Sequence, residues 1–224
     1  MIIKFDKRYK RRTNGDNMSA VLDRIDGLSA EQILAYFGQA DDITVDIFDV
    51  ANRIGIEVVP VDFSQLEEDT GCQKDSILGA VIDNDNTNKL KILIKNNLGT
   101  DEIFHGKTEH EKETVLRRRQ RFTVAHEIAH ACIHLSEQQK KFKVDFRMEL
   151  NSLSKEEAFD IREYKANVFA GELLIPEHSV KLVCEKLIYN SLNVLCEIFD
   201  VSHSVMSARL RHLGIEFVDD YKNA

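Results

Sequence analysis

Two histidines and a glutamate stand close together in the middle of this 224-residue chain, as His126-Glu127-Ile-Ala-His130. In an α-helix, residues four apart lie one turn apart and about 40° around the axis, so both imidazoles face the same way. Two such imidazoles can bind one metal ion, and Glu127 then lies beside the water that the metal would bind. The metal lowers the pKa of that water, and the glutamate accepts its proton. The spacing therefore predicts hydrolysis with Zn²⁺ as cofactor.

The neighbours of this motif predict that its two histidines face the protein interior. Four apolar residues share their helical stripe: Phe122, Ala125, Ala129 and Ile133. His134 continues the series by four residues, but it lies about 12 Å along the axis from His126, whereas zinc–nitrogen bonds are about 2.0–2.1 Å. We therefore interpret His134 as a group at the helix end, or one that hydrogen-bonds to a ligand, and not as the third ligand.

A hydrolytic zinc site keeps three protein ligands and one open position, so a further ligand must come from elsewhere in the chain. The second long helical pattern offers four candidates: Glu156, Glu157, Glu163 and Glu172. The run Ser154-Lys-Glu-Glu157 fits a capping box, which gives Glu157 a structural role at the start of that helix.

Glu163 differs from the other candidates because its helical face is apolar, with Ala166, Ala170, Leu173 and Leu174. A carboxylate on an apolar face is costly unless it is paired or binds a metal. Asp160 and Asn167 flank Glu163 at three and four residues and could orient the ligands, although a plain hydrogen-bonding role is equally compatible with the sequence.

The elements that must position these residues are both helical and extended. Helical spacing predicts two helices between residues 29 and 54, the second ending at Gly55, and a strand over 56–63 in which Pro60 favours the sheet edge. Apolar runs at 78–82 and 90–94, joined by polar residues, predict an antiparallel pair. Helical patterns follow at about 113–135 and 154–174, and shorter ones continue from Pro176 to Leu213. The fold class is therefore α+β, with a small antiparallel sheet.

The composition is typical of a globular protein, with 43% hydrophobic and 30% charged residues and a formal charge of −8. No stretch approaches the roughly 20 apolar residues of a membrane span, and the N-terminus lacks the apolar block of a secretory signal, so we expect a cytoplasmic protein. The four cysteines, at 72, 132, 184 and 196, form no Cys-x-x-Cys pair, which argues against a cysteine-bound zinc and against a disulfide framework.

Two separated runs together resemble the ImmA/IrrE family of bacterial metallo-endopeptidases: Arg121-Phe-Thr-Val-Ala-His-Glu-Ile-Ala-His130 and Glu163-Tyr-Lys-Ala-Asn-Val-Phe-Ala-Gly-Glu-Leu-Leu-Ile-Pro176. The resemblance covers about residues 46–213. It implies that His126, His130 and Glu163 bind zinc and that Glu127 is the catalytic base. It also implies a thermolysin-like (zincin) core, with the sheet against the active-site helix, and cleavage of a helix-turn-helix repressor of a mobile element or stress regulon, often encoded nearby. The separation of His130 from Glu163 is long for the family, which predicts an insertion within 136–155.

We expect three parts: a flexible basic arm at 1–17, a zinc metallopeptidase domain at 18–180 and a helical, helix-turn-helix-like segment at 181–224. Two rival hypotheses are a DNA-binding regulator with a vestigial metal site and a non-catalytic toxin–antitoxin component. Residues 176–224 carry five basic and seven acidic side chains, a net charge of −2, which disfavours DNA binding even though Arg209 and Arg211 lie on the last predicted helix. The sequence leaves the oxyanion-stabilising group open among Tyr164, His178 and His203.

Overall fold

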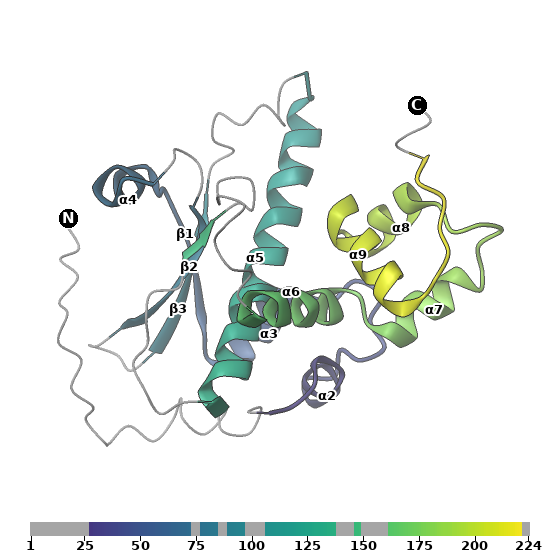
Figure 1. The fold of residues 1–224 in the computed structure, drawn as a ribbon, viewed down its shortest axis with the longest axis horizontal. Helices are drawn as coiled ribbons and strands as arrows, with labels where there is room; N and C mark the ends of the chain where they lie inside the picture. The colour runs from purple at the N-terminus through teal and green to yellow at the C-terminus, as the bar shows by residue number, and fades with distance from the viewer. Residues whose placement is uncertain are drawn as a thin grey trace.

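The computed structural model describes residues 27–72, 77–84, 89–96, 106–137, 146–148 and 161–220. Its central element is the long helix α5 (Glu109–Glu137), which stands between the β-sheet and the C-terminal helices in Figure 1. On one side α5 contacts β2 (Ile77–Asn84) and β3 (Lys89–Lys95), and on the other it contacts α3 (Ile47–Ile54) and α6 (Ile161–Leu174). The chain is thus mixed α+β, as predicted. The predicted arm at 1–17 lies outside the described residues.

The described strands form one sheet in the order β1-β3-β2-β4, with β1 at Glu57–Val61 and β4 at Phe146–Met148. The antiparallel pairing of β2 with β3 confirms the prediction for those two runs, and β1 lies at the sheet edge as Pro60 indicated. The prediction of an antiparallel sheet is wrong for β1, which pairs in parallel with β3. The reason is the connection through α4 (Ser64–Thr70): β2 comes first and turns back into β3, so β3 runs in the direction of β1.

Local sequence explains where the first helices begin and end. Ser29 caps α2 (Ala30–Tyr36) in a capping box with Gln32, and Asp46 caps α3 by accepting from the Asp49 N–H. Gly55 ends α3 at a φ of 93°, the left-handed conformation that glycine adopts without steric cost. The two predicted helices and the predicted end at Gly55 are therefore confirmed.

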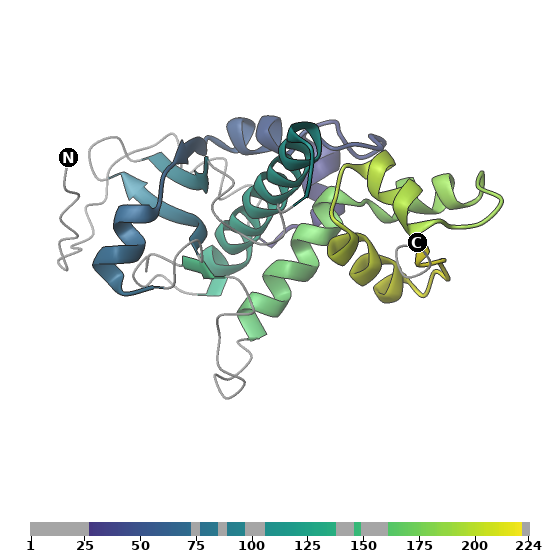
Figure 2. The same cartoon turned by 90° about the horizontal axis from the view of Figure 1, so that it is seen from above.

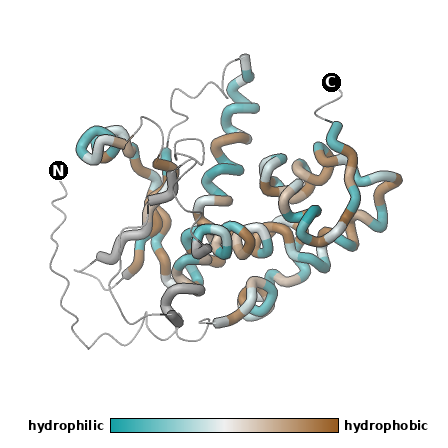
Figure 3. Tube along the Cα trace, viewed as in Figure 1, coloured by the Kyte–Doolittle hydropathy of each residue, from teal (hydrophilic) through white to brown (hydrophobic). Residues whose placement is uncertain are grey.

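One apolar core joins the two ends of the described chain. It includes buried residues of α2, α3 and α5 together with residues of α7 (Glu177–Cys184), α8 (Leu192–Phe199) and α9 (His203–Leu213). Figure 2 shows α5 and α6 between the sheet and these C-terminal helices, and Figure 3 shows that the first turns of α5 are mostly hydrophilic. None of the helices in the described ranges combines the length and the apolar character that crossing a membrane requires.

Three arginines of α5 converge on Asp200, in the turn between α8 and α9. Arg117 donates to the two carboxylate oxygens from Nε at 2.8 Å and from Nη2 at 2.9 Å, and Arg118 Nε donates to Oδ1 at 3.2 Å. Arg121 donates to the Asp200 carbonyl at 3.1 Å and to the Val45 carbonyl at 3.1 Å. Burial opposes ionisation of Asp200, but the hydrogen bonds from Arg117 and Arg118 outweigh it and lower the pKa of the carboxyl. The turn is thereby fixed to the helix that carries His126.

We expect Asp200→Asn to lower the free energy of unfolding by about 2 kcal/mol, because it removes the charge that pairs with partly buried arginines. Asparagine tolerates the φ of 51° at this position, so backbone conformation is preserved. Glu177→Gln breaks the exposed pair with Lys181 and should change stability by less than about 0.5 kcal/mol. Denaturant titration at pH 7 measures both. An Asp200→Asn effect no larger than the control would contradict this role.

The same pair of proteins gives a pH test of Asp200. A carboxyl whose pKa is lower in the folded state stabilises the fold at pH values above the unfolded pKa. This contribution disappears as the pH falls through the lower, folded pKa. The stability difference between wild type and Asp200→Asn should therefore be complete at neutral pH and shrink below pH 3.8, the ordinary value for this group. A difference that grows on acidification would contradict the sign.

Candidate metal centre

Helix α5 carries the predicted motif within a single uninterrupted segment. Its start is fixed by Thr108, whose hydroxyl accepts from the Glu111 N–H at 3.3 Å while the Glu111 carboxylate accepts from the Thr108 N–H at 2.7 Å. It begins a few residues before the predicted start at about 113 and extends two residues past the predicted end at 135. The motif residues of this helix are buried: His126 and Glu127 are each 1% exposed and His130 is 7% exposed.

The structure brings three of the predicted residues together. The Nε2 atoms of His126 and His130 lie 2.9 Å apart. Glu163, on α6, places Oε2 at 3.2 Å from the first of these atoms and Oε1 at 3.2 Å from the second. Within the described ranges, this is the one cluster of histidine, cysteine and acidic side chains whose donor atoms all lie within 4.8 Å of one another.

Asn167 fixes the orientation of one imidazole. Its Oδ1 lies 3.0 Å from Nδ1 of His126, and an amide oxygen can only accept, so Nδ1 carries the hydrogen of this bond. A neutral ring protonated at Nδ1 presents the lone pair of Nε2, and that atom faces His130 and Glu163. Asn167 therefore hydrogen-bonds His126, which fits both roles that the sequence left open for it, while Asp160 lies outside the described residues.

The donor set and its spacing fit a tetrahedral zinc ion. Zinc bonds of 2.0–2.1 Å place neighbouring ligand atoms about 3.3 Å apart, close to the separations of 2.9, 3.2 and 3.2 Å among these three side chains. Two imidazoles and one carboxylate are also a common donor set of catalytic zinc. When no metal is bound and the imidazoles are protonated at Nε2, hydrogen bonds from His126 and then His130 hold the pKa of Glu163 well below its usual range, although partial burial opposes this. Glu163 is thus kept anionic, the form that binds a cation.

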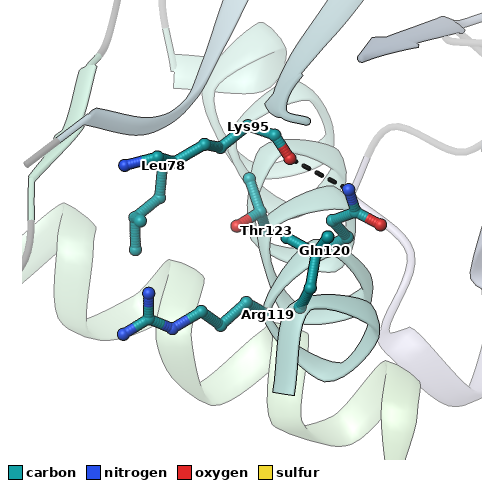
Figure 4. Close-up of a pocket in the computed structure, with 6 residues that line it drawn as sticks. Leu78, Lys95, Arg119, Gln120 and Thr123 are labelled. Atoms are coloured by element: carbon teal, nitrogen blue, oxygen red, sulfur yellow. Dashed lines mark hydrogen bonds between the residues drawn. The ribbon is translucent and has the colours of Figure 1, made fainter. Parts of the chain in front are cut away.

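The Glu127 carboxylate lies close to strand β2. Its Oε1 lies 3.5 Å from the position that a Cβ on Gly79 of β2 would occupy. One turn earlier on the same face, Thr123 is 2% exposed. Figure 4 shows Thr123 beside Lys95 and Gln120 at a small cavity, where the Gln120 amide donates to the Lys95 carbonyl at 2.9 Å and ties α5 to β3. The Glu127 carboxylate is thus enclosed between α5 and the sheet.

Other predicted candidates lie elsewhere or outside the described residues. Glu172 pairs with Arg209 of α9 at 3.3 Å, and Glu156 and Glu157 are not described. The helix reaches His134, as predicted, but its side chain is not described. Of the oxyanion candidates, His203 hydrogen-bonds Asn193, and Tyr164 and His178 are exposed. None of these contacts joins the cluster of His126, His130 and Glu163.

Sequence reasoning missed Gly79, the residue of β2 that faces Thr123 and Glu127. The signal was present, because a glycine inside an apolar strand often marks a close approach of another backbone or ligand. The sequence alone did not indicate which helix would approach it, since that depends on how the sheet packs on α5.

Comparison with known proteins places this site in a peptidase family. Residues 110–211 match the family model for the IrrE N-terminal-like domain of M78 peptidases, a range that contains the motif of α5 and the Glu163 helix. No curated protein matches the chain. The match over residues 110–211 supports the assignment of this chain to the ImmA/IrrE family of metallopeptidases.

Proposed function

We propose that this protein is a zinc-dependent endopeptidase in which His126, His130 and Glu163 hold the metal and Glu127 is the catalytic base. The observation that carries the proposal is the convergence of two imidazole nitrogens and a carboxylate from two helices, with separations of 2.9–3.2 Å. The family match supports a metallopeptidase, and the donor set supports zinc among the common metals.

When bound, zinc polarises a substrate carbonyl and lowers the pKa of water. The protein supplies the proton transfer. Glu127 takes a proton from the attacking water and later gives it to the departing amine, so that one carboxylate serves both halves of peptide hydrolysis. Enclosure of Glu127 raises the efficiency of this transfer, since charges interact more strongly away from bulk water. Asn167 holds the His126 ring in the orientation that the ligand requires.

The cluster is accessible from one side. The side chain of Glu163 is 47% exposed, whereas those of His126 and His130 are 2% and 7% exposed. A substrate could therefore approach over Glu163, with α5 and the sheet forming the closed side. This arrangement supports the thermolysin-like (zincin) core that the resemblance implies, in which the sheet lies against the active-site helix.

We propose a protein substrate, a helix-turn-helix transcriptional repressor of a mobile element or stress regulon encoded near this gene. The support is the family, because the resemblance of the two motif runs implies that target class. The helix-turn-helix protein encoded nearest to this gene is therefore the substrate with which to test cleavage.

The rival hypothesis of a DNA-binding regulator is disfavoured by the contacts of α9. Arg209 is 7% exposed and donates to the Ile175 carbonyl at 3.2 Å, in addition to its pair with Glu172. The guanidinium of Arg211 lies 5.7 Å from the ring centroid of Phe217. Helix α9 also buries Met206 and Leu210. Arg209 is thus engaged within the protein whereas Arg211 is exposed, and the burial of Arg209, Met206 and Leu210 supports a role of α9 in packing or substrate docking.

Glu127→Gln should retain about one zinc per chain and lose at least about 100-fold in the rate of repressor cleavage, because the base is removed while the ligands remain. Zinc content by mass spectrometry of the metal and cleavage followed on gels measure the two quantities. Undiminished cleavage by this variant would refute the assignment of Glu127.

Glu163→Ala should weaken zinc binding by more than about 100-fold, and Asn167→Ala by roughly 10-fold, because loss of a ligand exceeds loss of a group that orients one. Glu172→Ala is the matched control on the same helix, since Glu172 pairs with Arg209 instead of joining the cluster. Competition with a zinc-sensitive chelating dye gives the three affinities. If Glu172→Ala weakened binding most, the wrong glutamate would have been assigned.

Binding to the promoter of the nearest repressor gene should be weak and unaffected by Arg209→Ala or Arg211→Ala, because Arg209 is buried and paired and residues 176–224 carry a net charge of −2. Fluorescence anisotropy between about 50 and 200 mM salt measures it, the range over which phosphate contacts weaken markedly. Salt-sensitive binding that both substitutions abolish would favour the regulator.

A further inference from the structure

The strand β2 crosses α5 at Gly79, where the structure leaves no room for a side chain. A Cβ built on Gly79 would lie 2.2 Å from Cγ2 of Thr123, far inside van der Waals contact, and 3.3 Å from the Leu93 carbonyl oxygen. Gly79 is not among the glycines with positive φ, so its backbone conformation does not require glycine. The requirement at this position is therefore steric and comes from the approach of α5.

The same crossing encloses the proposed catalytic base. Thr123 and Glu127 are four residues apart on α5, so they lie one above the other on the face that meets β2. The built Cβ would lie 3.5 Å from Oε1 of Glu127, an ordinary contact. Both residues are almost fully buried, at 2% and 1% exposure, so neither can turn into solvent to make space.

Strand β2 cannot readily move aside to accept a larger residue. Gly79 pairs with Ile94 of β3 on one side and with Arg147 of β4 on the other. The strand is thus held in the sheet from both edges, while β3 is tied to α5 through Gln120. A side chain at position 79 would consequently displace Thr123, and with it the turn of α5 that carries Glu127.

We propose that Gly79 is a positioning residue whose missing side chain sets the distance between β2 and α5 and so the placement of the Glu127 carboxylate beside the metal ligands. This inference rests on the proposed function, because it concerns the base of that reaction. Proton transfer requires contact at hydrogen-bonding distance, and a displacement of about 1 Å can cost about 100-fold in rate. Gly79 touches neither metal nor substrate in this account and acts through Thr123 and Glu127.

The test is a double-variant cycle of Gly79→Ala, Thr123→Ser and the combination. Serine keeps the Thr123 hydroxyl and removes the methyl group that a Cβ at position 79 would strike. We expect Gly79→Ala to lower kcat by about 100-fold with KM and zinc content nearly unchanged, and the combination to recover at least about 10-fold. Gly171→Ala on α6 is the matched control and should be neutral, because a Cβ there meets nothing within 4 Å.

Thermal unfolding of the zinc-loaded proteins provides a readout that does not depend on activity. Gly79→Ala should lower the midpoint by roughly 5 °C, and Thr123→Ser should restore most of the loss when the two are combined. Additive effects in the cycle, or wild-type kcat in Gly79→Ala, would overturn the proposal. Recovery of the midpoint without recovery of kcat would also overturn it, since the residue would then be purely structural.

Two cases need a separate comparison: a Gly79→Ala variant that does not fold, and a wild type that does not cleave the nearest helix-turn-helix protein. If Gly79→Ala does not fold by itself, Gly79→Ala and Gly79→Val are both made in the Thr123→Ser background and compared. A lower kcat for the valine variant at equal zinc content supports the proposal. Equal kcat values for the two variants refute it. If the wild type does not cleave the nearest helix-turn-helix protein, the proposed substrate is wrong, and the thermal unfolding midpoints alone test the Gly79 contact. Recovery of the midpoint in the double variant supports the contact, and additive changes of the midpoint refute it.

Discussion

The close packing of α6 on α5 is the constraint on which the site depends. His126 and His130 converge because they lie one turn apart, but Glu163 reaches them only because the two helices approach closely. Ala125 and Ala129 precede the two histidines on α5, Ala166 and Ala170 follow Glu163 on α6, and all four alanines are fully buried. Small residues permit a short interaxial distance where two helices touch, and α5 and α6 bring two imidazoles and a carboxylate within 4.8 Å of one another.

The remaining elements hold α5 at a defined position between two layers. On the sheet side, Gly79 and Gln120 set how closely β2 and β3 lie to the helix. On the opposite side, Asp200 accepts hydrogen bonds from three arginines of α5, and these bonds join the α8–α9 turn to α5. One buried core includes residues of α5, α6 and the C-terminal helices. The part of α5 from Arg117 to His130 is therefore held from both sides, which keeps Glu127 and the histidines in register with Glu163.

The sequence predicted the local features well because they depend on spacing and capping. Four-residue spacing placed the two histidines on one helical face, and the apolar face around Glu163 distinguished it from three other glutamates. Long-range features were missed, since nothing near Asp200 indicates that arginines about eighty residues earlier will pair with it. The parallel pairing of β1 was missed because it follows from the path through α4, whose sequence has little apolar periodicity. The sequence also did not indicate that Arg209 would be buried, because its partner Glu172 comes from α6.

The identity and geometry of the metal ligands test the central claim most directly. X-ray absorption at the zinc edge of the zinc-loaded protein reports the atoms bound to the metal and their distances. Ligation by His126, His130 and Glu163 predicts two imidazole nitrogens at about 2.0–2.1 Å, carboxylate oxygen at about 2.0–2.2 Å and no sulfur. In Glu163→Ala, the imidazole scattering should persist while the carboxylate contribution is lost. A sulfur shell near 2.3 Å, or a wild-type spectrum without imidazole scattering, would contradict the account.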